Sequence, residues 1–173
     1  MTQRTELATV MDRLAVDDLV TAYAVTVDDG DWAAYRRLFT ADGRADYRSA
    51  GGIEGGADQV AAWLAGSLAP FTMRQHLIVN RSLRFGVLEH DTGDTARVRA
   101  DYVSPLRRSG AGAPDVPHTP DAPHASGALD LICGGRYGFG LLRTVDGWRL
   151  NEVVVHERWR RGPDTGPAAD ASR

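Results

Sequence analysis

The sequence predicts an α+β domain in which three N-terminal helices pack on a strongly curved, mixed or antiparallel β-sheet. Apolar residues recur at helical intervals before Pro70, and after Pro70 the pattern changes to long runs in which apolar and polar residues alternate. Helices that precede a series of strands favour an arrangement with the helices on one face of the sheet. We therefore expect a cone-shaped fold that encloses a pocket.

Three segments have helical periodicity. The first begins at Leu7 and stops at Asp29, where Gly30 can adopt the left-handed conformation of a C-cap. Its apolar face contains Val10, Leu14, Leu19, Val20, Tyr23 and Val27. Asp31 is expected to cap a second helix that runs to about Phe39. A turn at 40–43, a strand at 44–49 and a third helix at 56–68 follow.

The remaining strands are predicted by four long alternating runs, at residues 72–85, 95–106, 129–144 and 148–159. The separator Val145-Asp146-Gly147 has the composition of a hairpin turn. Residues 107–127 contain four prolines and are expected to form a long surface loop, either a lid or an inert insertion. The chain is then one domain over residues 1–161, with a disordered tail at 162–173.

Composition excludes several classes of protein. The net charge of −3 and the absence of a basic run disfavour nucleic acid and anionic membranes as partners. The N-terminus lacks a signal-peptide pattern and no apolar run approaches the ~18 residues of a membrane span, so a cytoplasmic protein is expected. Cys133 is the only cysteine, and its apolar surroundings predict a buried strand residue instead of a nucleophile.

Metal and nucleotide chemistry find no support in the motifs. His118 and His124 are six residues apart in the proline-rich loop, His90 lies in a turn, and no His-x-His or Glu-x-x-His pattern occurs. The sequence also lacks the Gly-x-Ser-x-Gly elbow and a phosphate-binding glycine loop followed by lysine. We expect no metal and no organic cofactor.

The candidate chemistry rests on Asp28 and His76. Asp28 lies near the end of the first helix and His76 in the first long strand. A carboxylate that receives the Nδ1–H of a histidine fixes its tautomer and leaves Nε2 as a general base. Two alternatives stay open: Asp28 can be a solvated helix-end acid, and His76 a hydrogen-bonded core residue.

Several tyrosines are candidates for a pocket. Tyr23 precedes Asp28 by five residues, so a pocket at the helix end could contact both. Tyr102 shares a strand face with small residues and could extend into a cavity. Tyr47 and Tyr137 fit strand packing as well as they fit a pocket.

The order of these features resembles the nuclear transport factor 2-like superfamily, in its scytalone dehydratase-like and SnoaL-like branch. The resemblance covers about residues 6–158. It rests on the segments Ala15–Tyr23, Asp28-Asp29-Gly30-Asp31-Trp32, Gln75-His76, Gly135-Arg136-Tyr137 and Asp146-Gly147-Trp148. The strand Arg44-Ala45-Asp46-Tyr47-Arg48-Ser49 is similar to one in scytalone dehydratase.

The resemblance implies roles for three residues. It carries the catalytic histidine onto His76, its aspartate partner onto Asp28, and a tyrosine that polarises the substrate carbonyl onto Tyr47. Tyr23, Tyr102 and Tyr137 are then expected to contact the substrate. The family's second pocket tyrosine falls on Val27, its second histidine near Pro105-Leu106, and its serine and asparagine near Arg136 and Gly138. Scytalone itself is therefore not the expected substrate.

The implied reaction is proton abstraction next to a carbonyl group. The first hypothesis is a cofactor-independent dehydratase that acts on a small hydroxylated carbonyl, polyketide-like or another secondary metabolite. The alternatives are a cyclase or isomerase that uses the same residues, and a non-catalytic small-molecule-binding module. A homo-oligomer is expected because the exposed outer face of an open sheet needs to be covered. The resemblance suggests a dimer or a trimer.

Overall fold

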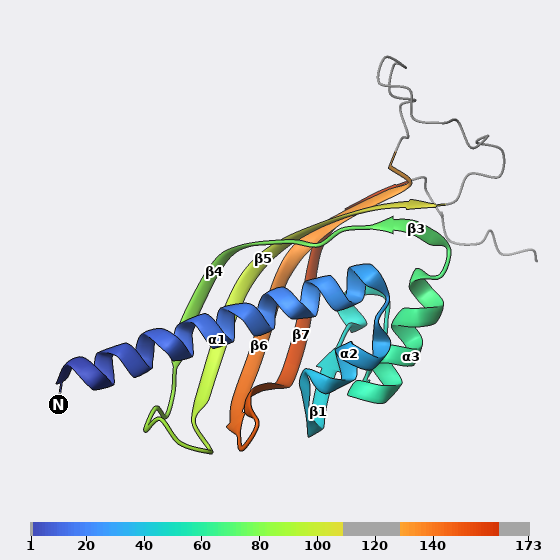
Figure 1. The fold of residues 1–173 in the computed structure, drawn as a ribbon. Coiled ribbons are helices and arrows are strands. Elements are labelled where there is room, and N and C mark those ends of the chain that lie inside the picture. Colours follow the sequence, from blue (N-terminus) through green and yellow to red (C-terminus); the bar gives the residue numbers. More distant parts are fainter. Residues whose placement is uncertain (1, 109–128, 163–173) are drawn as a thin grey trace, which may run out of the picture.

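The computed structural model describes residues 2–108 and 129–162, and in these ranges three α-helices lie along one curved sheet (Figure 1). The expected surface loop at 107–127 lies outside the described residues except for its first two positions, which end a strand. The expected tail at 162–173 lies outside them except for Gly162.

The helices are α1 (Thr2–Asp29), α2 (Trp32–Arg37) and α3 (Ala57–Leu68), with a 3₁₀ turn η1 (Arg48–Ala50). Both predicted caps are present. Gly30 ends α1 with a φ of 70°, which a residue with a Cβ rarely adopts. The Asp31 side chain accepts the backbone N–H of Ala34 at 2.8 Å and so begins α2.

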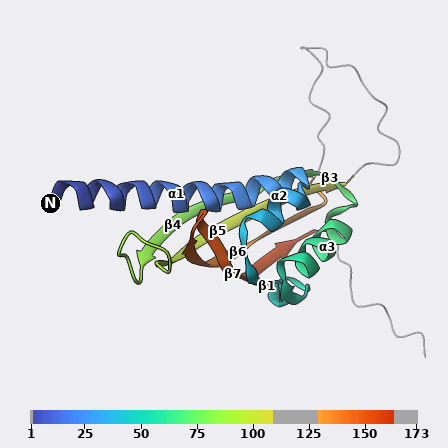
Figure 2. The ribbon, with the colours of Figure 1, turned by 60° about the horizontal axis from the view of Figure 1, so that its bottom comes forward.

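Only part of the predicted apolar face of α1 is buried. Its buried residues are Leu19, Val20, Tyr23 and Val27. Val10 and Leu14 are each more than half exposed. The prediction is wrong for these two because the N-terminal part of α1 extends past the sheet (Figure 2). Helical periodicity reveals an apolar face but not how far the sheet beneath it reaches.

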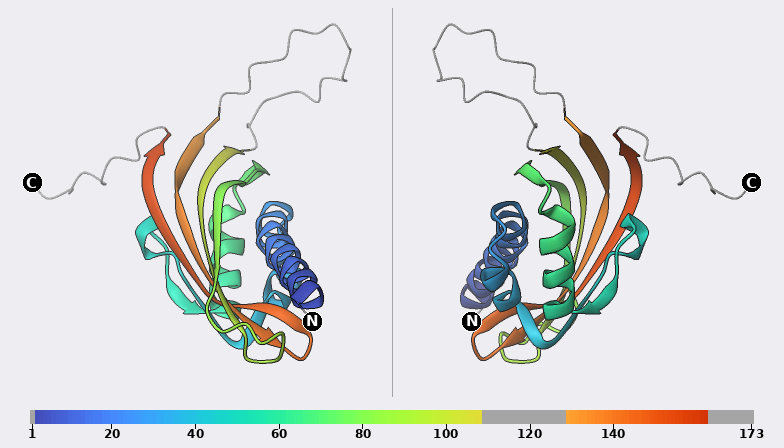
Figure 3. Two further views of the ribbon diagram at one scale, coloured as in Figure 1. Left: turned by 90° about the vertical axis from the view of Figure 1, so that its left-hand side faces the viewer. Right: turned by 90° about the vertical axis from the view of Figure 1, so that its right-hand side faces the viewer.

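The sheet is mixed and strongly curved, as predicted. Its strands are β1 (Phe39–Asp46), β2 (Glu54–Gly56), β3 (Phe71–Arg74), β4 (Leu77–Phe85), β5 (Thr95–Arg108), β6 (Leu131–Thr144) and β7 (Gly147–Arg161). They follow the order β2-β1-β7-β6-β5-β3, and β4 also pairs with β5. β1 and β7 are parallel, whereas the other pairs are antiparallel. The sheet curls around the helices as a half-barrel (Figure 3).

Three boundaries differ from the prediction. α2 ends at Arg37, and residues 40–43 belong to β1 instead of a turn, because Phe39 already pairs with Leu150 of β7. A register shift within β1 accommodates the extra residues. β1 ends at Asp46, so Tyr47 lies just beyond the strand.

The long strand expected at 72–85 is divided into β3 and β4, with Gln75 and His76 between them. The N–H of Gln75 still bonds the carbonyl of Pro105 in β5 at 3.3 Å, whereas the N–H of His76 turns to a side chain. Alternation continues across the interruption, which explains why the pattern did not reveal it.

The core fills the space between the concave face of the sheet and the helices, and Tyr23, Tyr35, Tyr137 and Phe139 are its largest fully buried side chains. Among residues 2–108 and 129–162, no helix is long and apolar enough to cross a membrane.

Candidate active site

The side chain of Asp28 holds His76 at the interruption between β3 and β4. Its Oδ2 accepts the backbone N–H of His76 at 2.7 Å, and its Oδ1 lies 2.6 Å from the ring Nδ1. An ionised carboxylate can only accept, so the proton of this short bond lies on Nδ1. The predicted meeting of Asp28 and His76 is present in the structure, and it leaves Nε2 without a hydrogen-bond partner in the described part of the chain.

His76 lines a cavity of about 350 Å³ at the open end of the half-barrel, and Asp28 lies behind it. The two side chains are 10% and 18% exposed, so the pair is largely shielded from water. Much of the wall is apolar or aromatic, with contributions from Val27, Trp63, Leu64 and Val155. A base at the edge of an apolar cavity is the usual setting for proton transfer from carbon.

Three of the candidate tyrosines, Tyr47, Tyr102 and Tyr137, line this cavity. Tyr23 does not: it is fully buried behind the wall, where its hydroxyl forms a hydrogen bond with the hydroxyl of Tyr47. The structure therefore places Tyr23 against Tyr47 and away from the cavity that a substrate would fill.

The backbone around Tyr47 is fixed by a tight turn. Its N–H donates to the carbonyl of Ile53 at 2.9 Å, and its carbonyl accepts from Ala50 at 2.9 Å and Gly52 at 3.0 Å. The Trp63 ring packs against the tyrosine ring with centroids 5.4 Å apart. These contacts fix the direction of the Tyr47 hydroxyl.

All five tyrosines of the chain surround the cavity or lie just behind its wall, and burial is the main reason why each has a raised pKa. Neighbouring tyrosines add to the effect for Tyr23 and Tyr47, because a second phenolate would repel the first. The phenols stay protonated, and those of the three tyrosines that line the cavity are available as hydrogen-bond donors to an oxygen there.

The cavity wall also contains residues that were not predicted to belong to the site. Ser104, Cys133 and Arg160 pair in register across β5, β6 and β7, and Glu157 lies on β7 beside them. Glu157 and Arg160 form two hydrogen bonds of 2.9 Å. The signal that could have found Glu157 is period-two alternation from Val153 and Val155, which are both buried.

Cys133 is buried, as predicted. Burial, together with the charge of nearby Glu157, raises the pKa of its thiol to about 11. Its sulfur lies 3.8 Å from the carbonyl oxygen of Ser104, to which it donates. The residue is therefore a neutral thiol at physiological pH and not an activated nucleophile.

A second aspartate–histidine pair lies elsewhere in the fold. Asp12 on α1 accepts from His90 Nδ1 at 2.9 Å, from Trp148 Nε1 at 3.2 Å and from the guanidinium of Arg143. Burial alone would raise the pKa of Asp12, but the bonds from Trp148, His90 and Arg143 outweigh it and lower the pKa. This pair ties α1 to the turns at the other end of the sheet and does not line the cavity.

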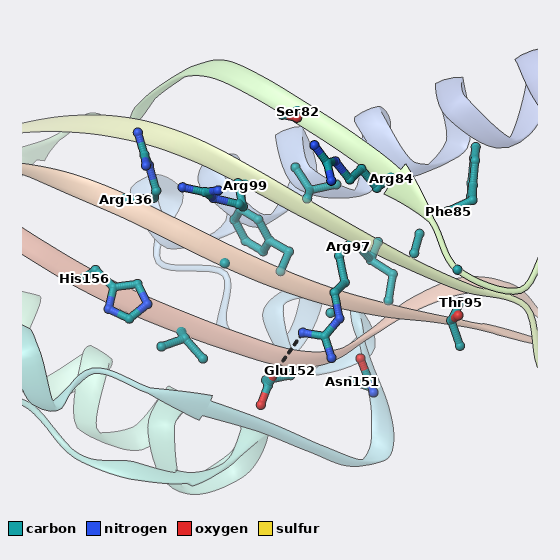
Figure 4. A pocket seen from close by; sticks show the side chains of 18 of the residues that line it. Ser82, Arg84, Phe85, Thr95, Arg97, Arg99, Arg136, Asn151, Glu152 and His156 are labelled. Carbon is teal, nitrogen blue, oxygen red and sulfur yellow. Dashed lines mark ion pairs between the residues drawn. The ribbon is translucent and has the colours of Figure 1, made fainter.

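A larger hollow of about 690 Å³ lies on the outer face of the sheet (Figure 4). Its labelled side chains include Arg84, Arg97, Arg99 and His156, which point outward from the strands. The Arg97–Glu152 ion pair there is long, at 3.9 Å, and well exposed. Since the hollow contains no buried base or nucleophile, the smaller cavity at His76 is the candidate site.

Metal-binding clusters of three or more His, Cys, Asp or Glu side chains do not occur within residues 2–108 and 129–162. His118 and His124, which the sequence analysis considered as ligands, lie outside the described residues.

A comparison with known protein families agrees with the fold described above. Residues 8–154 match the SnoaL-like domain family. The chain belongs to this family. Its SnoaL-like assignment confirms the resemblance to the nuclear transport factor 2-like superfamily that the sequence motifs suggested.

Several relatives of this SnoaL-like chain are known. It is 31% identical over 144 residues to an uncharacterized protein from Mycobacterium tuberculosis. The aligned residues cover 83% of this chain and 84% of the relative. Two crystal structures from Novosphingobium aromaticivorans have the same fold. One is provisionally described as an aromatic ring hydroxylase (24% identity, TM-score 0.67, covering 88% and 94%) and the other as a scytalone dehydratase (16%, 0.67, covering 99% and 100%).

Proposed function

We propose that this protein is a dehydratase that removes a proton next to the carbonyl group of a small hydroxylated carbonyl compound. His76 is the general base, Asp28 orients it, and Tyr47 donates a hydrogen bond to the carbonyl oxygen. The observation that carries the proposal is the Asp28–His76 pair with its free Nε2 at a cavity lined by three tyrosines.

The proposed reaction uses the groups that line the cavity. Nε2 takes a proton from the carbon beside the carbonyl, and negative charge develops on the carbonyl oxygen. The neutral phenol of Tyr47 stabilises that charge, and an apolar wall strengthens the interaction by excluding water. When the bond to a β-hydroxyl group breaks, the imidazolium returns its proton to the departing oxygen and water leaves. His76 is then ready for another cycle.

Proton abstraction, the first half of this reaction, is common to dehydratases, cyclases and isomerases. Dehydration is favoured here because the same histidine can return its proton to a hydroxyl leaving group on a neighbouring carbon. Among the structures with this fold, one is provisionally described as a scytalone dehydratase. Cyclisation and isomerisation by the same pair remain the alternatives.

The proton-abstraction step can be tested without the natural substrate. Exchange of the α-protons of 1-tetralone, a bicyclic ketone, is followed by NMR in D₂O with wild-type protein and with His76→Ala. We expect the wild type to accelerate exchange over buffer, and His76→Ala to lose a factor of about 100 or more, the usual contribution of a general base.

The matched control is His156→Ala, which removes a histidine from the outer face of the sheet and should leave exchange unchanged. Equal exchange by wild type and His76→Ala would overturn the proposed base. Ketone binding without exchange above buffer would instead favour the non-catalytic binding module. Assembly into a dimer or trimer stays a prediction, which light scattering can test.

A further inference from the structure

Glu157 of β7 lines the same cavity as His76. Its side chain is only 12% exposed. Arg160, which lines the same cavity, holds it through Nε and one terminal nitrogen, both at 2.9 Å, and that terminal nitrogen also bonds the carbonyl of Ala50 at 3.0 Å. The carboxylate is thus fixed in direction by its partner.

Glu157 has acceptor capacity to spare. An ionised carboxylate offers about four lone-pair positions, and Arg160 occupies two of them. The neighbouring Cys133 thiol donates to the carbonyl of Ser104 at 3.8 Å. A carboxylate acceptor at a cavity wall attracts hydrogen-bond donors.

The position of Glu157 relative to His76 sets the size of the ligand. By register, His76 lies opposite Ser104 in β5, and Glu157 lies on β7, two strands further across the sheet. Three inter-strand steps of about 4.8 Å give roughly 14 Å across the curved sheet, and a two-residue offset along the strands brings the separation of the two backbones to about 16 Å. Once both side chains extend into the cavity, the remaining gap fits a molecule of one or two rings.

We propose that Glu157 is the specificity-determining residue that accepts a hydrogen bond from a substrate hydroxyl at the end of the molecule away from the reacting carbonyl. The preferred ligand is then a one- or two-ring carbonyl compound with a distal hydroxyl group. This inference rests on the proposed function, because it takes the carbonyl to lie at His76 and Tyr47.

Three bicyclic ketones test the inference by binding alone. Dissociation constants of 1-tetralone, 6-hydroxy-1-tetralone and 6-methoxy-1-tetralone are measured by calorimetry. The wild type should bind the hydroxy compound about tenfold more tightly than either of the others, as expected of a hydrogen bond to a charged group that is partly exposed. The methoxy compound keeps the oxygen but has no hydrogen to donate.

Glu157→Gln should reduce this tenfold preference to twofold or less, because the amide keeps the shape and an acceptor for Arg160 but loses the charge. Glu152→Gln, on the outer face of the same strand, is the matched control and should keep the preference. Equal affinities for the hydroxy and methoxy compounds in the wild type would overturn the inference even if Glu157→Gln failed to fold. An unchanged preference in Glu157→Gln would overturn it as well.

The test of the Glu157 subsite and the test of catalysis by His76 can fail separately. If α-proton exchange depends on His76 while the hydroxyl preference ignores Glu157, the proposed reaction stands and the subsite fails. If the preference follows Glu157 while no exchange occurs, the subsite stands and the proposed reaction fails.

Discussion

The carboxylate of Asp28 bonds His76 twice, through the ring Nδ1 at 2.6 Å and through the backbone N–H at 2.7 Å. One side chain therefore fixes both the tautomer of the imidazole and the position of the backbone that supports it. The second bond also satisfies the N–H that the interruption between β3 and β4 removes from the sheet.

Asp28→Asn should test whether Asp28 orients the His76 ring. The amide cannot accept both N–H groups, so we expect the ring to lose its preference for the Nδ1–H tautomer and α-proton exchange to fall by about 100-fold or more. Nitrogen-15 NMR of the imidazole reports the tautomer directly. Retention of the Nδ1–H tautomer together with full exchange would contradict the assigned role of Asp28.

Asp12→Asn should act on stability, because Asp12 pairs with His90, Arg143 and Trp148 far from the cavity. Removal of one charge from a buried pair costs about 3 kcal/mol, measurable by urea unfolding. The His76 tautomer should not change. A stable Asp12→Asn protein with impaired proton exchange would show that the two aspartate–histidine pairs have the opposite roles.

The lowered pKa of Asp12 also predicts that the stability of the fold depends on pH. Because the pKa of Asp12 is lower in the folded protein than its ordinary value of 3.8, its ionised form stabilises the fold at higher pH. That contribution is complete above about pH 4 to 5 and is lost as the pH falls through the folded pKa. Urea unfolding across this range should show a smaller acid-induced loss for Asp12→Asn than for wild type.

Tyr23→Phe should slow proton exchange without weakening ketone binding. Tyr23 does not line the cavity, so its hydroxyl acts only through the hydroxyl of Tyr47. Tyr47→Phe removes the donor itself, with a loss of about 100-fold expected, whereas Tyr23→Phe should cost about tenfold. Exchange rates at saturating ketone, compared with dissociation constants, separate the two effects. A change in affinity alone for Tyr23→Phe would contradict this positioning role.

Two glycines of β6 offer a matched pair. A Cβ at Gly135 would lie 2.1 Å from the carbonyl oxygen of His156 and 2.9 Å from the Cα of Glu157, both backbone atoms that cannot move aside. A Cβ at Gly138 would meet its nearest atom at 4.0 Å. Gly135→Ala should therefore cost about 3 kcal/mol of unfolding free energy and displace Glu157, while Gly138→Ala should be neutral. Equal stability of the two variants would contradict the packing described at Gly135.

The sequence predicts the helices and long strands because these depend on short-range patterns of apolar residues. The pairing of Asp28 with His76 was predicted from side-chain chemistry and from the family resemblance. The interruption at His76 was not predictable, because its cause is a side chain 48 residues away.

Arg160 was missed for a different reason. A register shift between Gly134 and Gly135 changes which residues of β7 face the cavity, so that Arg160, and not Trp159, follows Glu157 on the inner side. Strict alternation would have placed Arg160 on the outer face. The adjacent glycines were the available signal, since they permit a close approach of the two strands.

The parallel pairing of β1 with β7 determines when the cavity can form. Ala45 pairs with Val153, more than one hundred residues later in the chain. Tyr47 follows the first of these strands and Glu157 belongs to the second, so the two ends of the chain each supply part of one wall. Contacts of such long range carry a large entropic cost of loop closure and form late in folding. During synthesis, the helices and the antiparallel strands can assemble first, and the binding cavity is completed only when the last strand has left the ribosome.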